Sequence, residues 1–265
     1  MIKKFAFVFT VVLLINSCAT VPVTGRRQLD LVSSDEINTM SASQYKEVIK
    51  KGPLSNNAEQ VAMIQRVGGR IEKAVEQYMA LKGASDQLAG FNWEFNLIQD
   101  DKTVNAWCMP GGKVAFYSAI IPICKDETGI AVVMGHEVAH AIANHGRERM
   151  SQGMLEQLGL STLGAAMGQN ATITKQIFLE AVGIGANLGM LKFSRTHESE
   201  ADHIGLIFMA MAGYDPHQAP KFWERMVAGA NGQKPPEFMS THPSDETRIK
   251  DLQGWMPEAL QYYKP

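Results

Sequence analysis

The amino-acid sequence predicts a mainly α-helical protein with a small antiparallel β-sheet, an α+β fold with a single globular domain. Most of the 265 residues fall in segments whose apolar side chains recur at helical spacing. Only residues 90–117 show the alternation typical of strands, together with a glycine-rich turn. The composition, with 45% apolar and 20% charged residues, is that of a chain able to bury a substantial core.

Local signals predict the elements in order. Ser33-Ser34-Asp35-Glu36 opens a helix that runs to about Lys51, because Gly52-Pro53 ends it. Helical spacing predicts further helices over residues 57–82, 118–124, 126–152 and 195–212. Residues 90–98 predict a strand, and residues 104–108 and 113–117 predict a hairpin. The apolar stretch 153–191 is divided by polar residues, which favours a pair of packed helices over a membrane span.

The N-terminus has the pattern of an export signal. Lys3 and Lys4 precede an apolar run over residues 5–15, which is shorter than the roughly 17 to 25 residues that a spanning helix needs. Ile15-Asn16-Ser17-Cys18 resembles the lipobox of bacterial lipoproteins, in which the cysteine carries the lipid. We therefore expect a signal peptide over 1–17, lipidation of Cys18, a tether over 18–32 and one domain over 33–265. Ala19 stands where an Asp would favour inner-membrane retention, so we expect an anchor in the outer membrane, facing the periplasm.

Charge and cysteine content exclude other classes of protein. The formal net charge is −2, without the basic stripe that nucleic-acid binding needs. The three cysteines form no CxxC pair, which argues against a thiolate zinc site and against a thioredoxin-like site. An oxidising compartment permits a disulfide between Cys108 and Cys124, but their placement beside a hairpin and a helix does not favour it.

Residues 136–140 carry the strongest chemical signal. His136-Glu137-Val138-Ala139-His140 places two imidazoles on one face of a helix, four residues apart, where they can share one ion. Zinc suits two neutral nitrogens and a carboxylate, and a catalytic zinc keeps a fourth position for water. Glu137 is placed to take a proton from that water.

The third ligand must come from elsewhere in the chain. His145, nine residues after His136, would point to the opposite side of a continuous helix and is expected at the surface or at a helix end. On the downstream helix Glu198 and Asp202 share a face with small residues, where a cation would offset two buried acids. Glu200 lies about 200° around that helix, so periodicity leaves both glutamates open.

Taken together, these motifs resemble the HtpX-like zinc metallopeptidases, a family that includes the CAAX prenyl proteases. The resemblance covers roughly residues 57–255, and the layout is similar to that of the LoiP-like and BepA-like lipid-tethered periplasmic members. It rests on the HEVAH motif, Glu198-x-x-Ala201-Asp202, Asn105-Ala106-Trp107, Pro110-Gly111-Gly112, the segment His145 to Met150, Ser194-Arg195 and Thr241-His242-Pro243. It implies a gluzincin-like fold, one Zn²⁺ per chain held by His136, His140 and Glu198, and Glu137 as the base.

Three further residues have two interpretations each. His242 either opens a helix before Pro243 or, as the resemblance implies, faces the zinc, stabilising the oxyanion or occupying the fourth position. Arg248 either supports the oxyanion and binds substrate or forms a surface salt bridge. Asn105 either faces an extended substrate added to its strand or lies on an ordinary sheet edge.

The function expected from the sequence is zinc-dependent endopeptidase action on unfolded or misassembled envelope proteins. The alternative is a chaperone-like lipoprotein that binds such clients, with proteolysis latent or secondary. A purely structural zinc site is disfavoured because Glu137 lies beside the ligands. The sequence indicates no oligomeric state.

Overall fold

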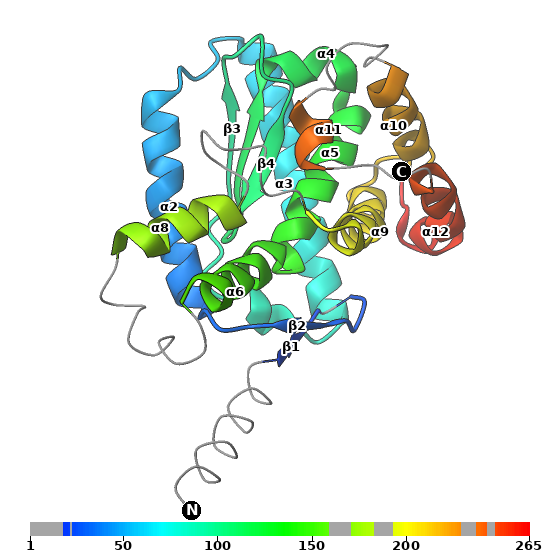
Figure 1. The fold of residues 1–265 in the computed structure, drawn as a ribbon. Helices are drawn as coiled ribbons and strands as arrows, with labels where there is room; N and C mark the ends of the chain where they lie inside the picture. The colour runs from blue at the N-terminus through cyan, green and yellow to red at the C-terminus, as the bar shows by residue number, and fades with distance from the viewer. Residues whose placement is uncertain (1–17, 22, 159–170, 183–192, 229–236, 243–246) are drawn as a thin grey trace, which may run out of the picture.

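The computed structural model describes residues 18–21, 23–158, 171–182, 193–228, 237–242 and 247–265 (Figure 1). The expected signal peptide, residues 1–17, lies outside the described residues, as do parts of the expected helical pair between residues 153 and 191. Of the stretch 153–191, the structure describes the end of a helix over His145–Leu158 (α6) and a helix over Ala171–Ala181 (α8), and these two helices pack against each other.

The described elements follow one another as helices interrupted by two small sheets. The strands are β1 (Cys18–Thr20), β2 (Arg27–Leu29), β3 (Glu94–Ile98), β4 (Ala106–Met109) and β5 (Lys113–Tyr117). The helices are α2 (Ser34–Lys51), α3 (Ala58–Leu81), α4 (Ile121–Cys124), α5 (Glu127–Ile142), α6 (His145–Leu158), α8 (Ala171–Ala181), α9 (Arg195–Met211), α10 (Gln218–Ala228), α11 (Glu237–Thr241) and α12 (Arg248–Tyr262), with short 3-10 turns at Ser85–Leu88 and Ser118–Ile120. The predicted fold class, mainly helical with a small sheet, is confirmed.

Side-chain caps begin α2 and α3, and the cap of α2 is the predicted one. The Ser33 side chain accepts a hydrogen bond from the backbone N–H of Glu36 at 3.2 Å, and α2 begins at the next residue. The Asn57 side chain caps α3 in the same way, accepting from the N–H of Gln60 at 3.1 Å. Gly52 ends α2, as predicted.

The three-stranded sheet has the order β3-β5-β4. The predicted hairpin is confirmed: β4 and β5 are antiparallel, with Trp107 opposite Ala115, and Gly111 and Gly112 adopt positive φ values of 80° and 79° in the turn. In addition, β3 pairs with β5 in parallel, because the chain passes from β3 to β4 at the far edge and returns through the middle.

One of the predicted helices is divided into two helices in the structure, α5 and α6. The expected helix over residues 126–152 is broken after Ala143, where Asn144 adopts a left-handed φ of 57°. This conformation ends α5, and the chain turns before α6 begins at His145.

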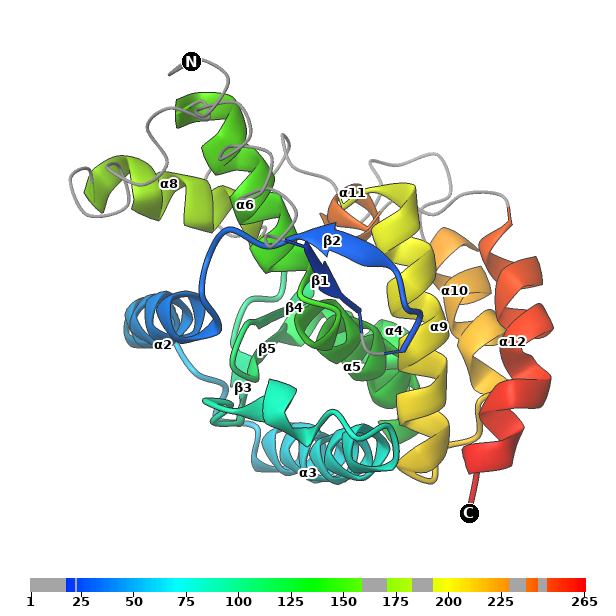
Figure 2. The same ribbon diagram turned by 90° about the horizontal axis from the view of Figure 1, so that it is seen from below.

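Residues 18–32, expected as a tether, are folded onto the domain. Strands β1 and β2 pair in antiparallel fashion, and Val21 and Val32 are buried. Figure 2 shows this pair of strands lying between α6 and α9. Runs of three residues are too short for their alternation to be recognised in the sequence.

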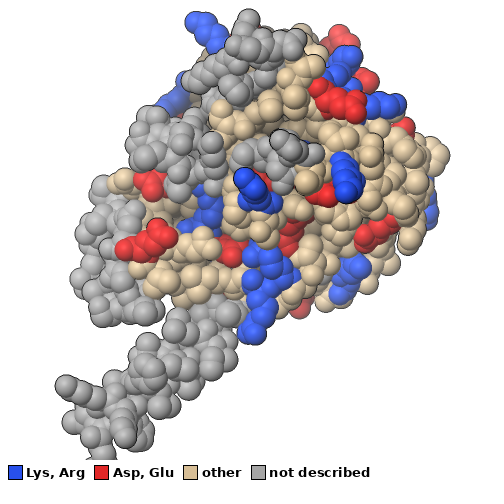
Figure 3. Space-filling view, turned by 45° about the vertical axis from the view of Figure 1, so that its right-hand side comes forward, with Lys and Arg blue, Asp and Glu red and all other residues tan. Residues whose placement is uncertain are grey.

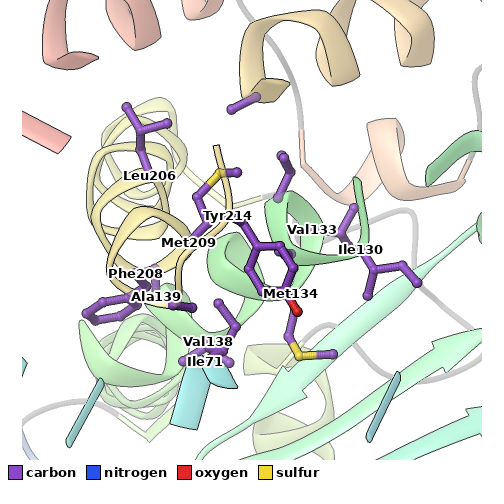
Figure 4. Packing of buried hydrophobic residues seen from close by; sticks show 14 of the residues in the cluster. Ile71, Ile130, Val133, Met134, Val138, Ala139, Leu206, Phe208, Met209 and Tyr214 are labelled. Atoms are coloured by element: carbon purple, nitrogen blue, oxygen red, sulfur yellow. The ribbon is translucent and has the colours of Figure 1, made fainter. Parts of the chain in front are cut away.

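Helix α5 lies at the centre of the molecule and is buried from Gly129 to Ile142. It packs against α9, α3 and β4, and α12 covers the other side of α9; Figure 4 shows the apolar contacts between α5 and α9. The two helices approach closely because Gly135 faces Gly205: a Cβ at residue 205 would stand 2.8 Å from the backbone of Gly135. Small residues beside the acids of α9 were predicted to allow another helix to approach. Gly205 is one of these residues, and it allows the close approach of α5.

Among the described helices, none is both long and apolar enough to cross a membrane. Cys108 and Cys124 are not joined in the structure, and Cys124 is buried. On the face shown in Figure 3, basic and acidic side chains are interspersed, without a surface of one sign.

Candidate metal centre

Four buried side chains, from two helices and from the residue that follows a third, meet at one point. His136 and His140 come from α5, Glu198 from the first turn of α9, and His242 follows the last residue of α11. Each offers one ligand atom, and these atoms all lie within 4.8 Å of one another. The cluster lies where α5, α9 and α11 converge (Figure 1).

The distances between these atoms fit a single metal ion. Tetrahedral zinc with bonds of about 2.0 to 2.2 Å requires ligand atoms roughly 3.3 to 3.6 Å apart. His136 Nε2 is 3.1 Å from His140 Nε2 and 3.4 Å from Glu198 Oε2, and His140 Nε2 is 3.5 Å from Glu198 Oε1. His242 Nδ1 lies 3.2 Å from His136 Nε2 and 3.0 Å from Glu198 Oε1. His242 therefore occupies the fourth corner.

The charges around the cluster call for a cation. Glu137, Glu198 and Asp202 are buried, and the buried Arg248 supplies one positive charge among them. With neutral histidines this leaves an excess of two negative charges in a dry environment, which is costly without a counterion. A divalent ion neutralises it.

The carboxylate of Glu137 faces the cluster without entering it. Its Oε1 lies 3.4 Å from His242 Nε2 and has no hydrogen-bond partner among the described residues. Burial raises the pKa of Glu137, against the opposing effects of His242 and His136. An unpartnered acceptor with a raised pKa is suited to take up a proton, as predicted for the base.

Each end of the His136–Glu198 pair is held by a second group. Asp202 Oδ1 lies 2.9 Å from His136 Nδ1, which is the contact expected for a carboxylate that orients a ligand imidazole. Arg248 donates to both acids, from Nη2 to Glu198 Oε2 and from Nε to Asp202 Oδ2, each at 2.6 Å. The guanidinium also lies over the ring of Trp223, 3.9 Å from its centroid. The surface salt bridge considered for Arg248 is therefore wrong, because the residue is buried and clamps the acids of α9.

In the absence of a metal, the pKa of His136 is raised and the pKa of His140 is lowered. Burial lowers the pKa of His136, but its bonds to Asp202 and Glu198 outweigh burial and raise the pKa to about 10. Burial and the neighbouring histidines hold the pKa of His140 well below its usual value. Metal binding at this site must therefore displace a proton from His136, as ligand imidazoles must be neutral.

The choice between the two glutamates of α9 is settled by their positions. Glu198 lies in the cluster, whereas Glu200 lies outside it and contacts His145, with Oε2 2.9 Å from Nε2. His145 is not at the surface: it begins α6 and is fully buried, with Nδ1 2.8 Å from His140 Nδ1. The expectation for its direction assumed a continuous helix, and the break at Asn144 turns it toward the site.

The two remaining predicted residues are placed as follows. His242 directly follows α11, and its N–H donates to the Phe238 carbonyl; residues 243–246, where a helix opened by His242 would begin, lie outside the described residues. Asn105 precedes the edge strand β4 and is buried, and its Oδ1 accepts from the N–H of Ala106 at 2.9 Å.

Comparison with known proteins agrees with this geometry. The model of peptidase family M48 matches residues 65–256, which include all four residues of the cluster. The chain belongs to peptidase family M48. The resemblance found in the sequence is confirmed at this level. This family of metallopeptidases is zinc-dependent, and the cluster of His136, His140, Glu198 and His242 could hold one metal ion.

Its M48 relatives include mitochondrial and bacterial proteins. The chain is 35% identical to the mitochondrial metalloendopeptidase OMA1 of Schizosaccharomyces pombe over 90% of its own length and 66% of that protein. It is 32% identical to the protein of the same name from Saccharomyces cerevisiae, over 92% and 70% of the two chains. It is 27% identical to the beta-barrel assembly-enhancing protease of Escherichia coli K12, over 90% and 47%. The chain thus spans about two thirds of these fungal relatives and about half of the bacterial one.

Proposed function

We propose that this chain is a zinc-dependent endopeptidase of the bacterial cell envelope that cleaves unfolded or misassembled proteins. The observation that carries the proposal is the pairing of a four-donor metal centre with Oε1 of Glu137, a carboxylate oxygen without a hydrogen-bond partner among the described residues. A structural zinc site has no use for such a group, whereas hydrolysis requires one.

The residues divide the chemistry between them. Zinc bound here would polarise the scissile carbonyl and lower the pKa of the attacking water. Glu137 accepts the proton of that water and passes it to the leaving amine. Asp202 and Arg248 hold His136 and Glu198 in place, so that the centre does not rearrange while charge develops.

Strand β4 offers a place for an extended substrate. It is at the edge of its sheet and packs against α5, and the backbone N–H of Cys108 hydrogen-bonds the carboxylate of Glu137. A peptide added along β4 would bring its carbonyl groups beside the base. Asn105, which directly precedes this strand, is proposed to contact the bound substrate, as is the buried Nη1 of Arg248, which has no partner among the described residues.

The envelope location rests on the N-terminal sequence. The apolar run over residues 5–15 and the Ile15-Asn16-Ser17-Cys18 pattern support export and lipidation of Cys18, with an outer-membrane anchor facing the periplasm. The bacterial relative is named for β-barrel assembly, which is compatible with clients in the envelope.

The substrate class is tested by comparing an unfolded substrate with a protein that can be offered folded or unfolded. A form in which residues 1–18 are replaced by a start methionine is incubated with casein, and with a disulfide-bonded protein before and after reduction. We expect casein and the reduced form to be cleaved and the native form to persist. If clients bind but neither casein nor the reduced form is cleaved, the chaperone-like alternative replaces this proposal.

His242 is expected to restrain the activity. Its Nδ1 occupies the fourth corner of the metal site, so water and substrate must displace it. His242→Ala should therefore raise the rate of casein cleavage several-fold, since the rate scales with the fraction of molecules whose fourth position is open. A lower kcat at unchanged KM would instead assign His242 to transition-state stabilisation.

A further inference from the structure

A second buried polar network lies beside the metal centre and reaches the N-terminal segment. It joins α6 and α9 to the turn between β1 and β2, as the arrangement in Figure 2 allows. Its members are Thr24, Arg26, His145, Glu148, His197 and Glu200. The M48 chemistry described above uses none of them.

The network begins at the metal ligand His140. Its Nε2 faces the cluster, so in the zinc-bound state its hydrogen is on Nδ1, which donates to His145 Nδ1 at 2.8 Å. The hydrogen of His145 is then on Nε2, which donates to Glu200 Oε2 at 2.9 Å. One assignment of tautomers thus satisfies both bonds and leaves Nε2 of His140 free to bind the metal.

The network ends on the N-terminal segment. Arg26 Nε donates to Glu200 Oε2 at 2.7 Å, and the hydroxyl of Thr24 donates to Glu200 Oε1. The same guanidinium forms two parallel bonds to Glu148, at 3.1 and 2.8 Å. Both carboxylates are buried, with side chains 4% and 8% exposed, so Arg26 supplies the cation that their burial requires.

The two histidine ligands are therefore supported in different ways. His136 is oriented by Asp202, a residue of α9 that Arg248 holds. His140 is oriented through His145 and Glu200, and the arginine that holds Glu200 lies 174 residues away in the sequence. Support for His140 thus depends on the N-terminal segment being seated on the domain.

We propose that Arg26 is a positioning residue for the zinc ligand His140, acting through Glu200 and His145. The segment after Cys18 thereby sets how firmly the metal centre holds its ion. This inference rests on the proposed function only in requiring zinc at the cluster. Because Cys18 lies in β1 and Arg26 comes directly before β2, with which β1 pairs, displacement of the proposed membrane anchor would act on this support.

The test measures zinc release to a chelator from the zinc-loaded full-length chain, at a temperature where circular dichroism shows each variant folded. Arg26→Gln is compared with Arg27→Gln, which removes the same charge from the exposed neighbouring residue. We expect Arg26→Gln to release zinc at least about threefold faster than wild type and Arg27→Gln to match wild type, whereas loss of the nearer group in His145→Ala should accelerate release by about 10- to 100-fold. Equal rates for Arg26→Gln and Arg27→Gln would overturn the proposal.

A double variant distinguishes a positioning role of Arg26 from a merely structural one. If Arg26 acts through His145, adding Arg26→Gln to His145→Ala should not accelerate release further, whereas independent effects would multiply. His145→Asn places an oxygen where Nδ1 stands and should restore slow release. Arg26→Lys, which keeps the charge but lacks the planar guanidinium that forms two parallel bonds to Glu148, should fall between wild type and Arg26→Gln. Multiplicative effects in the double variant, or no rescue by asparagine, would contradict the proposal, and both readouts are independent of peptide hydrolysis.

Discussion

Glu137→Gln is expected to lower the rate of casein cleavage by about 10²- to 10⁴-fold, the usual contribution of a general base. Glutamine keeps the size and one oxygen of the side chain, but it cannot accept the proton of the attacking water. The cluster of donors is untouched, so zinc content and melting temperature should remain close to those of the wild type. The measurement is the initial rate of cleavage beside metal analysis of the same sample.

The matched control for this substitution lies on the same helix. Glu127→Gln makes the same chemical change in the first turn of α5, where the carboxylate is partly exposed and pairs with Arg66. It should leave the rate of cleavage unchanged. Cleavage by Glu137→Gln at the rate of this control would show that Glu137 is not the base. The client-binding alternative would then be favoured.

Loss of both imidazoles of the HExxH motif is expected to abolish metal binding. A double variant, His136→Ala with His140→Ala, retains only Glu198 and His242 of the four donors, too few for the three protein ligands of a catalytic zinc. Zinc should fall from about one per chain to a trace, and cleavage should fall with it. The measurement is the zinc content of purified protein after dialysis against a metal-free buffer.

A second double variant controls for the loss of two histidines. His203 and His217 lie outside the cluster, where they pair with Glu258 and Asp215. Replacing both with alanine should leave zinc near one per chain. Near-stoichiometric zinc in the His136, His140 double variant would show that the ion binds elsewhere.

Local signals in the sequence predicted much of the fold. The cap at Ser33 and the stop at Gly52 placed the ends of α2 within a residue or two, and the apolar periodicity over residues 57–82 placed α3. These signals worked because each depends on a few neighbouring residues. The same holds for the HExxH spacing, which put His136 and His140 on one face of α5.

What the sequence did not predict depends on contacts between distant segments or on a single backbone conformation. Asn144 is compatible with a helix interior, yet its left-handed conformation ends α5 and turns His145 toward His140. The pairing of Arg26 with Glu148 and Glu200 joins residues more than 120 positions apart, so no periodicity reveals it. The position of Glu200 around its helix gave no indication that its carboxylate pairs with Arg26 of the N-terminal segment.

The most direct test of the account is a titration of activity with zinc. The chain is freed of metal with a chelator, dialysed, and supplied with increasing amounts of zinc while casein cleavage is measured. We predict no cleavage without metal, a linear rise, and a plateau at one zinc per chain, because His136, His140 and Glu198 form one site whose water Glu137 activates. Full cleavage by the metal-free chain, or none at any zinc concentration, would contradict it.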